Sequence, residues 1–247
     1  MPKIGSVTLG SIPRVVLAVG EYSDDLKDAY AAGVSVLEIR IDLFQKLEAG
    51  YIRSQLEQFK KANLPLMATL RPEIEGGKWA GSESVRKQLL LECIEYVDAV
   101  DIELAANEIN AEISAAFKKA GKTLIVSNHS FGETPPNETL KGLLDDAKRL
   151  GADIIKLACL SEHTEDVTRL LSFVEANKAS GLIGISMGAK GAISRIAAPM
   201  FGSLLTYTSR DLNYGQLPLK EMVHMLRVLY PAFNEEFVVS RQVIEMA

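Results

Sequence analysis

Ionisable side chains interrupt several short apolar runs in this sequence. The sharpest case is Lys156, which stands inside the otherwise apolar run Asp153–Leu160. An exposed lysine, with a pKa of about 10.4, is almost fully protonated at pH 7 and is a poor nucleophile. Because burial and neighbouring cations both favour the free amine, Lys156 is a candidate for Schiff-base formation with a ketone or an aldehyde. The alternative is a lysine that pairs with Glu103 or Glu38, or that reaches solvent at the rim.

His129 ends the run that precedes this lysine along the chain, Lys122–His129. If the two runs are neighbouring strands, the imidazole and the amine can meet, which general acid–base catalysis at an imine requires. A lone histidine at a strand end more often forms only a structural hydrogen bond. The order of the two runs nevertheless predicts that Lys156 and His129 share one site.

Arginines form the second group of candidates. Arg40, Arg71 and Arg195 are suited to bind a carboxylate or a phosphate through paired N–H donors. The alternative is a network of ion pairs with carboxylates, and for Arg40 this alternative is favoured because a carboxylate stands two residues away on either side, on the same face of a strand. The carboxylates available for such a network are Glu38, Asp42 and Glu75.

The loop after Arg71 also contains charged residues. Glu73 and Glu75 are followed by Gly76 and Gly77. The residues alone predict that both glutamates are solvated and that the glycines allow this loop to move over the site.

Eight apolar, β-branched runs must position these residues, and a polar, amphipathic stretch follows each run. Near-continuous apolar runs are typical of parallel strands that are buried on both faces. We expect one helix in every gap; the clearest are Ser82–Glu95 and Asn137–Leu150, with Gly33, Gly121 and Gly151 at helix ends. The runs are Arg14–Gly20, Val34–Asp42, Pro65–Arg71, Val97–Leu104, Lys122–His129, Asp153–Leu160, Gly181–Gly188 and Ser203–Thr208.

Eight strands that alternate with helices predict an α/β fold, a single (β/α)8 TIM barrel over residues 1–247. A doubly wound open sheet is the alternative, but it more often has five or six strands. Residues 1–12 are predicted to form an N-terminal cap, with a short hairpin that closes the barrel bottom, and 231–247 a C-terminal tail. In such a barrel the strand ends at the C-terminal mouth carry function, and most of the candidates above lie there.

The composition limits the classes of function. The chain has 247 residues, of which 47% are hydrophobic and 24% charged, so it can bury a core and is not disordered. Its net charge of −5 argues against nucleic-acid and anionic-membrane binding. Cys93 and Cys159 suit neither a disulfide framework nor a zinc site, and the apolar run near the N-terminus, Val15–Val19, is too short to span a membrane. These features predict a cytoplasmic protein.

In ordered combination, the motifs resemble those of one family, the type I 3-dehydroquinate dehydratases of the shikimate pathway. The resemblance covers residues 12–220, and no single motif is decisive. The motifs are E-I-R-I-D at Glu38–Asp42, T-L-R-P-E-I-E-G-G at Thr69–Gly77, S-N-H-S-F at Ser127–Phe131, D-I-I-K-L-A at Asp153–Ala158, I-S-M-G at Ile185–Gly188, S-R at Ser194–Arg195 and G-Q at Gly215–Gln216.

The resemblance implies a mechanism. Lys156 would form an imine with the ketone of 3-dehydroquinate, and His129 would remove the adjacent proton and return one to the departing hydroxyl, giving syn loss of water and 3-dehydroshikimate. Glu75 would orient the histidine, and Arg195 would bind the substrate carboxylate. The resemblance implies no metal, no organic cofactor and a homodimer. Further substrate contacts would come from Glu38, Arg40, Arg71, Met187 and Gln216.

One segment departs from the family pattern. The loop that usually reads S-A-P-G-Q is Leu212–Gln216 here, so the serine and the proline are missing. Asn213 or Ser209 is the candidate to replace the lost hydrogen bond. Two alternative functions remain at this point: another Schiff-base barrel, such as an aldolase, and a catalytically silent barrel that binds a metabolite.

Overall fold

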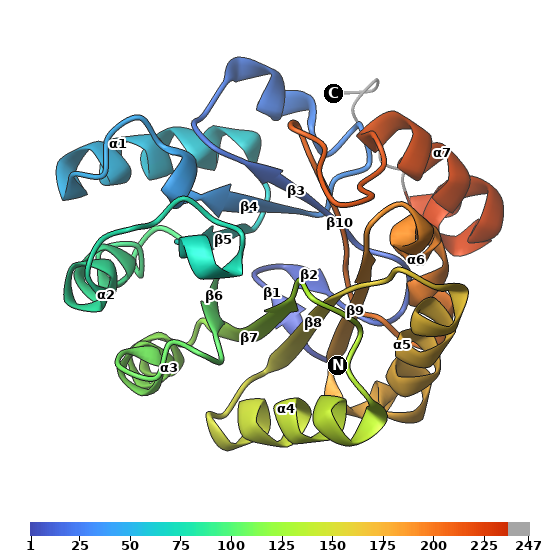
Figure 1. The fold of residues 1–247 in the computed structure, drawn as a ribbon. Helices are drawn as coiled ribbons and strands as arrows, with labels where there is room; N and C mark the ends of the chain where they lie inside the picture. The colour runs from blue at the N-terminus through green and yellow to red at the C-terminus, as the bar shows by residue number, and fades with distance from the viewer. Residues whose placement is uncertain (237–247) are drawn as a thin grey trace.

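Eight parallel strands form the centre of the computed structural model, which describes residues 1–236 (Figure 1). Each of the eight predicted runs overlaps one strand, although β7 and β10 each extend one residue beyond their runs, and the order around the sheet is β10-β3-β4-β5-β6-β7-β8-β9. The strands are β3 (Val15–Val19), β4 (Val36–Arg40), β5 (Leu66–Thr69), β6 (Ala99–Glu103), β7 (Thr123–Ser130), β8 (Ile154–Leu160), β9 (Leu182–Met187) and β10 (Thr206–Ser209).

The sheet curves into a nearly closed barrel, which confirms the predicted fold. β10 pairs with β3, so the last strand lies beside the first. At the remaining seam between β9 and β10, the amide of Leu204 donates to the carbonyl oxygen of Leu182 over 2.9 Å. The carboxyl ends of all eight strands therefore meet at one mouth.

Helices surround the barrel because each buries one apolar stripe against the strands (Figure 1). In α4, for example, Leu140, Leu144 and Ala147 are buried at helical spacing, and in α2 the side chain of Ser82 caps the helix by accepting from the amide of Val85. The helices are α1 (Ala49–Phe59), α2 (Glu83–Leu91), α3 (Asn110–Lys119), α4 (Asn137–Arg149), α5 (Thr164–Ala176), α6 (Ser194–Ala197) and α7 (Leu219–Leu229).

The expectation of one α-helix in every gap was wrong for the first gap. Between β3 and β4 the chain forms only a 3-10 helix, η1 (Asp24–Asp28). This gap is short and ends at Gly33, whose φ of 101° places it in the left-handed region. A Cβ there would lie 2.9 Å from the side chain of Val223 on α7, so the turn needs glycine to pack this closely. Gly121 and Gly151, the other two predicted helix ends, also have positive φ.

The predicted N-terminal hairpin is present and closes the amino-terminal end of the barrel. Strands β1 (Lys3–Ile4) and β2 (Val7–Thr8) are antiparallel, and Ile4 and Leu9 are fully buried. Both side chains pack in the same apolar cluster as the first inward-facing residues of the barrel strands.

The predicted C-terminal tail lies partly in the described region. Residues 231–236 continue as a helical segment after α7, and Phe233 is fully buried in a cluster with Val15 and Leu226. Phe233 therefore anchors this segment on the barrel. Residues 237–247 of the predicted tail lie outside the described residues.

The barrel interior is built in three levels, because every second residue of a strand faces inward. The lowest level is apolar and consists of Val16, Val36, Met67, Ala99, Ile125, Ile154, Ile183 and Leu205. The middle level is formed by the residue two positions further along each strand: Ala18, Glu38, Thr69, Asp101, Ser127, Lys156, Ile185 and Tyr207. The mouth level consists of Gly20, Arg40, Arg71, Glu103, His129, Ala158, Met187 and Ser209.

Across residues 1–236, none of the helices is both long enough and apolar enough to cross a bilayer.

Candidate active site

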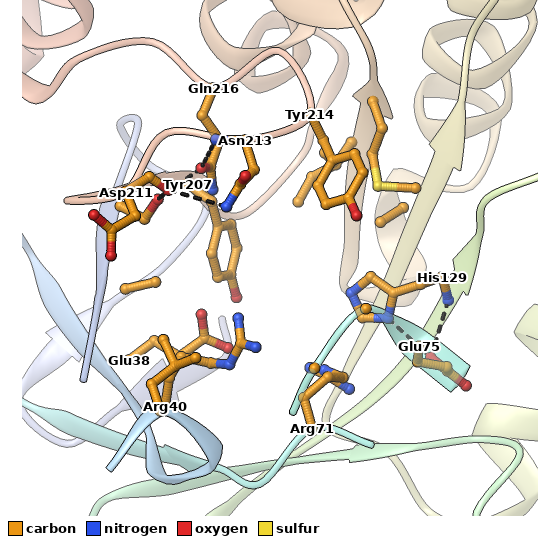
Figure 2. A pocket seen from close by; sticks show the side chains of 18 of the residues that line it. Glu38, Arg40, Arg71, Glu75, His129, Tyr207, Asp211, Asn213, Tyr214 and Gln216 are labelled. Carbon is orange, nitrogen blue, oxygen red and sulfur yellow. Dashed lines mark hydrogen bonds and ion pairs between the residues drawn. The ribbon is translucent and has the colours of Figure 1, made fainter. Parts of the chain in front are cut away.

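A cavity of about 550 Å³ opens at the carboxyl ends of the strands (Figure 2). Every predicted site residue lines it: Glu38, Arg40, Arg71, Glu75, His129, Lys156, Met187, Arg195 and Gln216. These residues come from four strands (β4, β7, β8 and β9), from helix α6 and from the segments that follow β5 and β10, so the barrel geometry brings them together. The individual contacts decide what each residue is free to do.

Lys156 is buried at the middle level, where its ammonium group is paired with carboxylates. Its Nζ donates to Oδ2 of Asp101 over 3.0 Å and lies 3.8 Å from Oε1 of Glu38. Glu38 was among the expected partners. Asp101 was not expected as a partner. Glu103, the other expected partner, pairs with Arg71 and Arg86 instead. The face of the Tyr207 ring lies 4.4 Å from Nζ, measured to its centroid.

His129 stands at the mouth level of β7, two residues beyond Ser127, which pairs with Lys156 in the strand register. Its ring Nδ1 lies 2.9 Å from Oε2 of Glu75, and the same oxygen accepts from the His129 backbone amide over 3.2 Å (Figure 2). Burial, together with the positive charges of Arg71 and Lys156, holds the pKa of His129 well below its usual value. The imidazole is therefore neutral at pH 7 and can accept a proton.

Glu75 is buried, so the expectation that it is solvated was wrong, whereas Glu73 is exposed. The short 3-10 helix η4 (Glu73–Glu75) turns this carboxylate toward His129, and it ends at Gly76, which has a φ of 77°. A Cβ at Gly77 would lie 2.0 Å from the backbone oxygen of Arg71. The two glycines thus let the loop pack closely on the site. Burial raises the pKa of Glu75.

Arg71 is enclosed in a network of buried ion pairs. Its guanidinium contacts Asp101 over 2.7 Å, and it also bonds to Glu103 and to Ser127. Arg86 from α2 contacts the second oxygen of Glu103. The predicted alternative of an ion-pair network therefore holds for Arg71, but with Asp101 and Glu103 in place of Glu38, Asp42 and Glu75.

The Asp101 carboxylate is the centre of this network. Oδ1 accepts from Arg71 and, over 2.6 Å, from the hydroxyl of Ser127, while Oδ2 accepts from Lys156. Burial alone would raise the pKa of Asp101, but the charges of Arg71 and Lys156 overcome that effect and hold it well below its usual range. Asp101 is thus a permanent anion next to the amine.

Arg40 pairs with Asp42, as its flanking carboxylates indicated. Its Nε and Nη2 bond to the two oxygens of Asp42 over 2.9 and 2.7 Å. Asp42 also accepts from the backbone amides of Arg71 and Lys78, so it fastens the loop after β5. The Arg40 guanidinium remains at the cavity wall, with its charge already balanced.

Arg195 differs from the other arginines of the cavity. Among residues 1–236, no carboxylate lies within ion-pair distance of its guanidinium, and its Nε has no hydrogen-bond partner. The one hydrogen bond that its side chain makes to these residues is from Nη2 to the backbone oxygen of Tyr214 over 3.3 Å. Burial lowers the pKa of Arg195 to about 10. A buried cation without a counterion is suited to bind an anionic ligand.

The loop between β10 and α7 covers one side of the mouth (Figure 2). Oε1 of Gln216 accepts from the hydroxyl of Ser209 over 2.6 Å and from the backbone amide of Asn213 over 3.0 Å. A Cβ at Gly215 would lie 2.1 Å from the backbone oxygen of Gly188, so glycine is required where this loop meets β9. Ser209, one of the two residues suggested to replace the missing serine, makes a side-chain contact with Gln216.

Apolar groups complete the wall. Met187 is buried beside Ile185 and Ala158, and across the mouth the rings of Phe131 and Tyr214 lie 5.3 Å apart between centroids. Phe131 also stacks on His129, with centroids 6.3 Å apart. The cavity therefore has an apolar side next to the imidazole and a charged side next to the amine.

Sequence reasoning missed two residues that contact the amine, Asp101 and Tyr207. For Asp101 a signal was present, because it stands two residues before Glu103 in the run Val97–Leu104 and so shares its face. Tyr207 carries no such signal, since a tyrosine in a strand is ordinary.

This arrangement combines a buried amine, a neutral imidazole and an unpaired cation in one cavity. An amine beside an anion can add to a carbonyl once it has lost a proton, and the imidazole can move protons next to it. In the part of the chain that the structure describes, no three histidine, cysteine or acidic side chains are grouped as a metal site would require.

Comparisons with known proteins point to one family. The model of the type I 3-dehydroquinase family matches residues 12–232. A 3-dehydroquinate dehydratase from Methanococcoides burtonii is 37% identical over 93% of this chain and 100% of its own length. The crystal structure of the 3-dehydroquinate dehydratase from Aquifex aeolicus superposes with a TM-score of 0.78 at 34% identity, over 88% of this chain and 99% of that one. A type I enzyme from Clostridium difficile superposes with a TM-score of 0.82 at 27% identity, over 92% and 96%.

Proposed function

The chain belongs to the type I 3-dehydroquinase family, and from this membership we propose the part that each residue of its cavity plays in the reaction. The enzyme is a lyase of the shikimate pathway that removes water from 3-dehydroquinate through a lysine Schiff base. The product is 3-dehydroshikimate. The site assignments below rest on the contacts of the cavity.

Lys156 is the nucleophile. As an ammonium it is held by Asp101, and it attacks as the free amine, so one proton must first pass to a base; the neutral imidazole of His129 is available in the same cavity. Nζ then bonds to the ketone carbon, the oxygen leaves as water, and a protonated imine remains. The positive imine withdraws electrons and acidifies the adjacent C–H.

His129 is the general base and then the general acid. This role requires the tautomer in which Nδ1–H donates to Glu75, because Nε2 is then the acceptor toward the substrate. Nε2 takes the proton from the carbon, a C=C bond forms as the C–O bond of the neighbouring hydroxyl breaks, and the imidazolium protonates the leaving oxygen. One group that serves both steps gives syn elimination.

Arg195 binds the substrate carboxylate, because it is the buried cation of the cavity whose charge the described residues leave unbalanced. Arg40 and Glu38 contact substrate hydroxyls, Met187 packs on the ring, and Gln216 holds the covering loop in place. Arg71 acts through Asp101, which it orients next to the amine.

The observation that carries this assignment is a buried amine that shares one cavity with a neutral, carboxylate-held imidazole. It is tested by mixing the protein with 3-dehydroquinate, adding borohydride, and mapping the mass increase on peptides. We expect a reduced adduct on Lys156 and none in Lys156→Met. Turnover by the wild type with no adduct, or an adduct on another lysine, would overturn the assignment.

We also propose that the enzyme acts as a homodimer, as the family resemblance implies, and in the cytoplasm, as the composition predicts. Exposed apolar side chains on α7, among them Val228 and Leu229, are compatible with association. Light scattering on the purified protein tests this: a mass of two chains is expected, and a single-chain mass at micromolar concentration would contradict it.

A further inference from the structure

We propose that the hydroxyl of Tyr207 donates a hydrogen bond to the ketone oxygen of the substrate while Lys156 adds to the carbonyl carbon. This inference rests on the proposed function, since it names one more group that touches the substrate in the same reaction. It concerns formation and hydrolysis of the imine, rather than proton abstraction from carbon.

The position of Tyr207 brings it to the reacting atoms. It lies on β10 at the middle level of the barrel interior, the level of Lys156, and only 3% of its surface is exposed. The amine of Lys156 lies over its ring, 4.4 Å from the centroid. Tyr207 lines the cavity, and its hydroxyl points from β10 toward Glu38 and Arg40 (Figure 2).

The hydroxyl of Tyr207 has no hydrogen-bond partner among residues 1–236, although it is buried. Buried hydroxyls are normally paired. Even two half-buried tyrosines of this chain pair their hydroxyls: Tyr51 donates to Glu21 over 2.8 Å, and Tyr230 donates to the backbone oxygen of Ile196 over 2.7 Å. A buried donor that lines an active-site cavity without an acceptor is matched to an acceptor that the ligand brings.

The nearby carboxylates do not supply this acceptor. Asp101 uses both oxygens for Arg71, Ser127 and Lys156, and Oε1 of Glu38 accepts from the hydroxyl of Thr69 over 2.9 Å. Burial, followed by the negative charges of Glu38 and Asp101, raises the pKa of Tyr207 well above its usual value. The phenol therefore keeps its proton and is a hydrogen-bond donor at any working pH.

The substrate atom that meets this donor follows from the chemistry. The carbon that Lys156 attacks must approach Nζ, and the oxygen on that carbon lies next to it. As the N–C bond forms, the π electrons of the carbonyl move to this oxygen, where negative charge develops. A fixed donor stabilises that charge. Both protons that turn the oxygen into water come from the ammonium nitrogen, one of them by way of His129, so Tyr207 ends the step with its own proton.

Tyr207→Phe isolates the hydroxyl, because the ring and its contact with Lys156 remain. We expect the rate of imine formation, measured by rapid mixing and borohydride quench, to fall at least about tenfold. We also expect the kinetic isotope effect from deuterium on the abstracted carbon to shrink toward one, since imine formation becomes slower relative to proton abstraction.

A matched control is Tyr96→Phe. The Tyr96 ring also faces a lysine amine, that of Lys60 at 5.0 Å, but Tyr96 does not line the cavity. Its imine formation should stay at the wild-type rate. The melting temperature of Tyr207→Phe should equal or exceed that of the wild type, because the variant loses an unpaired buried hydroxyl.

Imine formation at the wild-type rate in Tyr207→Phe would overturn the inference. So would a melting temperature clearly below that of the wild type, because it would show that the hydroxyl has a structural partner. Failure of the proposed function is distinguishable from both results, since the wild-type protein itself would then form no adduct.

Discussion

The cationic side chains of the cavity differ in whether a neighbour already balances their charge. Arg40 has Asp42, Arg71 has Asp101 and Glu103, and Lys156 has Asp101. Arg195 has only a backbone oxygen. A paired cation gains little from a further anion, whereas a buried, unpaired one gains a strong bond.

Replacing Arg195 by Met should therefore weaken binding of the carboxylate more than it slows the chemistry. A hydrogen bond to a charged group contributes about 1.5–3 kcal/mol, so KM should rise roughly tenfold to a hundredfold. Because the pKa of Arg195 is about 10, kcat/KM of the wild type should also fall as the pH rises through that value. Steady-state kinetics of Arg195→Met and of a surface control, Arg53→Met, check this; an unchanged KM in Arg195→Met contradicts it.

His129→Ala should slow imine formation, in which the imidazole relays one proton, and should block the step that follows it, proton abstraction from carbon. General acid–base catalysis contributes about 10²–10⁴-fold, so kcat should fall by that factor while an adduct accumulates on Lys156. Mass spectrometry of the intact protein after mixing with substrate measures the adduct directly. If His129→Ala turned over at the wild-type rate, the general-base role would be excluded.

At the scale of elements, the β10–α7 loop lacks the usual serine and proline and is held by hydrogen bonds to the retained glutamine, Gln216. Gln216 joins Ser209 at the end of β10 to Asn213 within the loop. Its side chain therefore fastens one turn of chain over the mouth, and the loop conformation depends on these two hydrogen bonds.

Gln216→Ala should raise KM more than it lowers kcat, since the loop must be ordered again each time substrate binds. Each lost hydrogen bond corresponds to about 0.5–1.5 kcal/mol, which predicts a change of roughly twofold to tenfold per bond. Ser209→Ala removes one of the two bonds and should give the smaller effect. A Gln216→Ala enzyme with wild-type KM would show that this side chain has no part in the site.

Helix α2 reaches the active site through Arg86. This side chain is almost fully buried. Its Nε donates to the backbone oxygen of Leu70, and its guanidinium forms ion pairs with Glu83 and Glu103. Glu103 in turn forms an ion pair with Arg71. An outer helix is thus linked by alternating charges to the carboxylate that holds the amine. Removal of any member leaves its neighbour buried without a full complement of partners.

Arg86→Met should destabilise the protein by about 3 kcal/mol, which for a chain of this size lowers the melting temperature by roughly 6–12 °C. The double variant Arg86→Met/Glu103→Gln removes the stranded carboxylate, so it should lose less stability than the sum of the two single variants. Thermal unfolding of the four proteins tests this. Additive losses would mean that the two residues are not coupled.

At the scale of the whole molecule, strands were more predictable than contacts. Apolar runs such as Lys122–His129 marked all eight strands, because burial on both faces excludes polar residues. The partner of Lys156 was not predictable in the same way. Glu38, Asp101 and Glu103 all face inward, and only their distances from Nζ in the folded barrel decide which of them pairs with it. The burial of Glu75 was also missed from the residues alone, because a loop of glutamates and glycines is ordinarily solvated. The family resemblance supplied that role.

Stability should respond to pH through the buried pair of His129 and Glu75. Below about pH 6.5 the unfolded chain protonates this histidine while the folded protein does not, so the free energy of unfolding falls as the pH falls. The raised pKa of Glu75 acts in the opposite sense, because the folded carboxyl binds a proton more readily than the unfolded one.

The variant Glu75→Gln removes this opposing contribution. Between pH 6.5 and 5 it should lose up to about 1.4 kcal/mol of stability per pH unit through His129. In Glu75→Gln/His129→Gln this part of the slope should vanish. Denaturant titrations at several pH values measure both slopes, and equal slopes would rule out a neutral, buried His129.

The apolar level beneath Lys156 packs against Ile4 and Leu9 of the hairpin and closes the cavity at its lower end. Substrate, product and water therefore enter and leave the cavity through the mouth. Each catalytic cycle releases one water when the imine forms, releases a second in the elimination, and consumes one when the imine is hydrolysed. Because the β10–α7 loop covers one side of the mouth, water must enter and leave past a covalently bound ring, and exchange of the smallest reactant depends on the same loop as exchange of the largest.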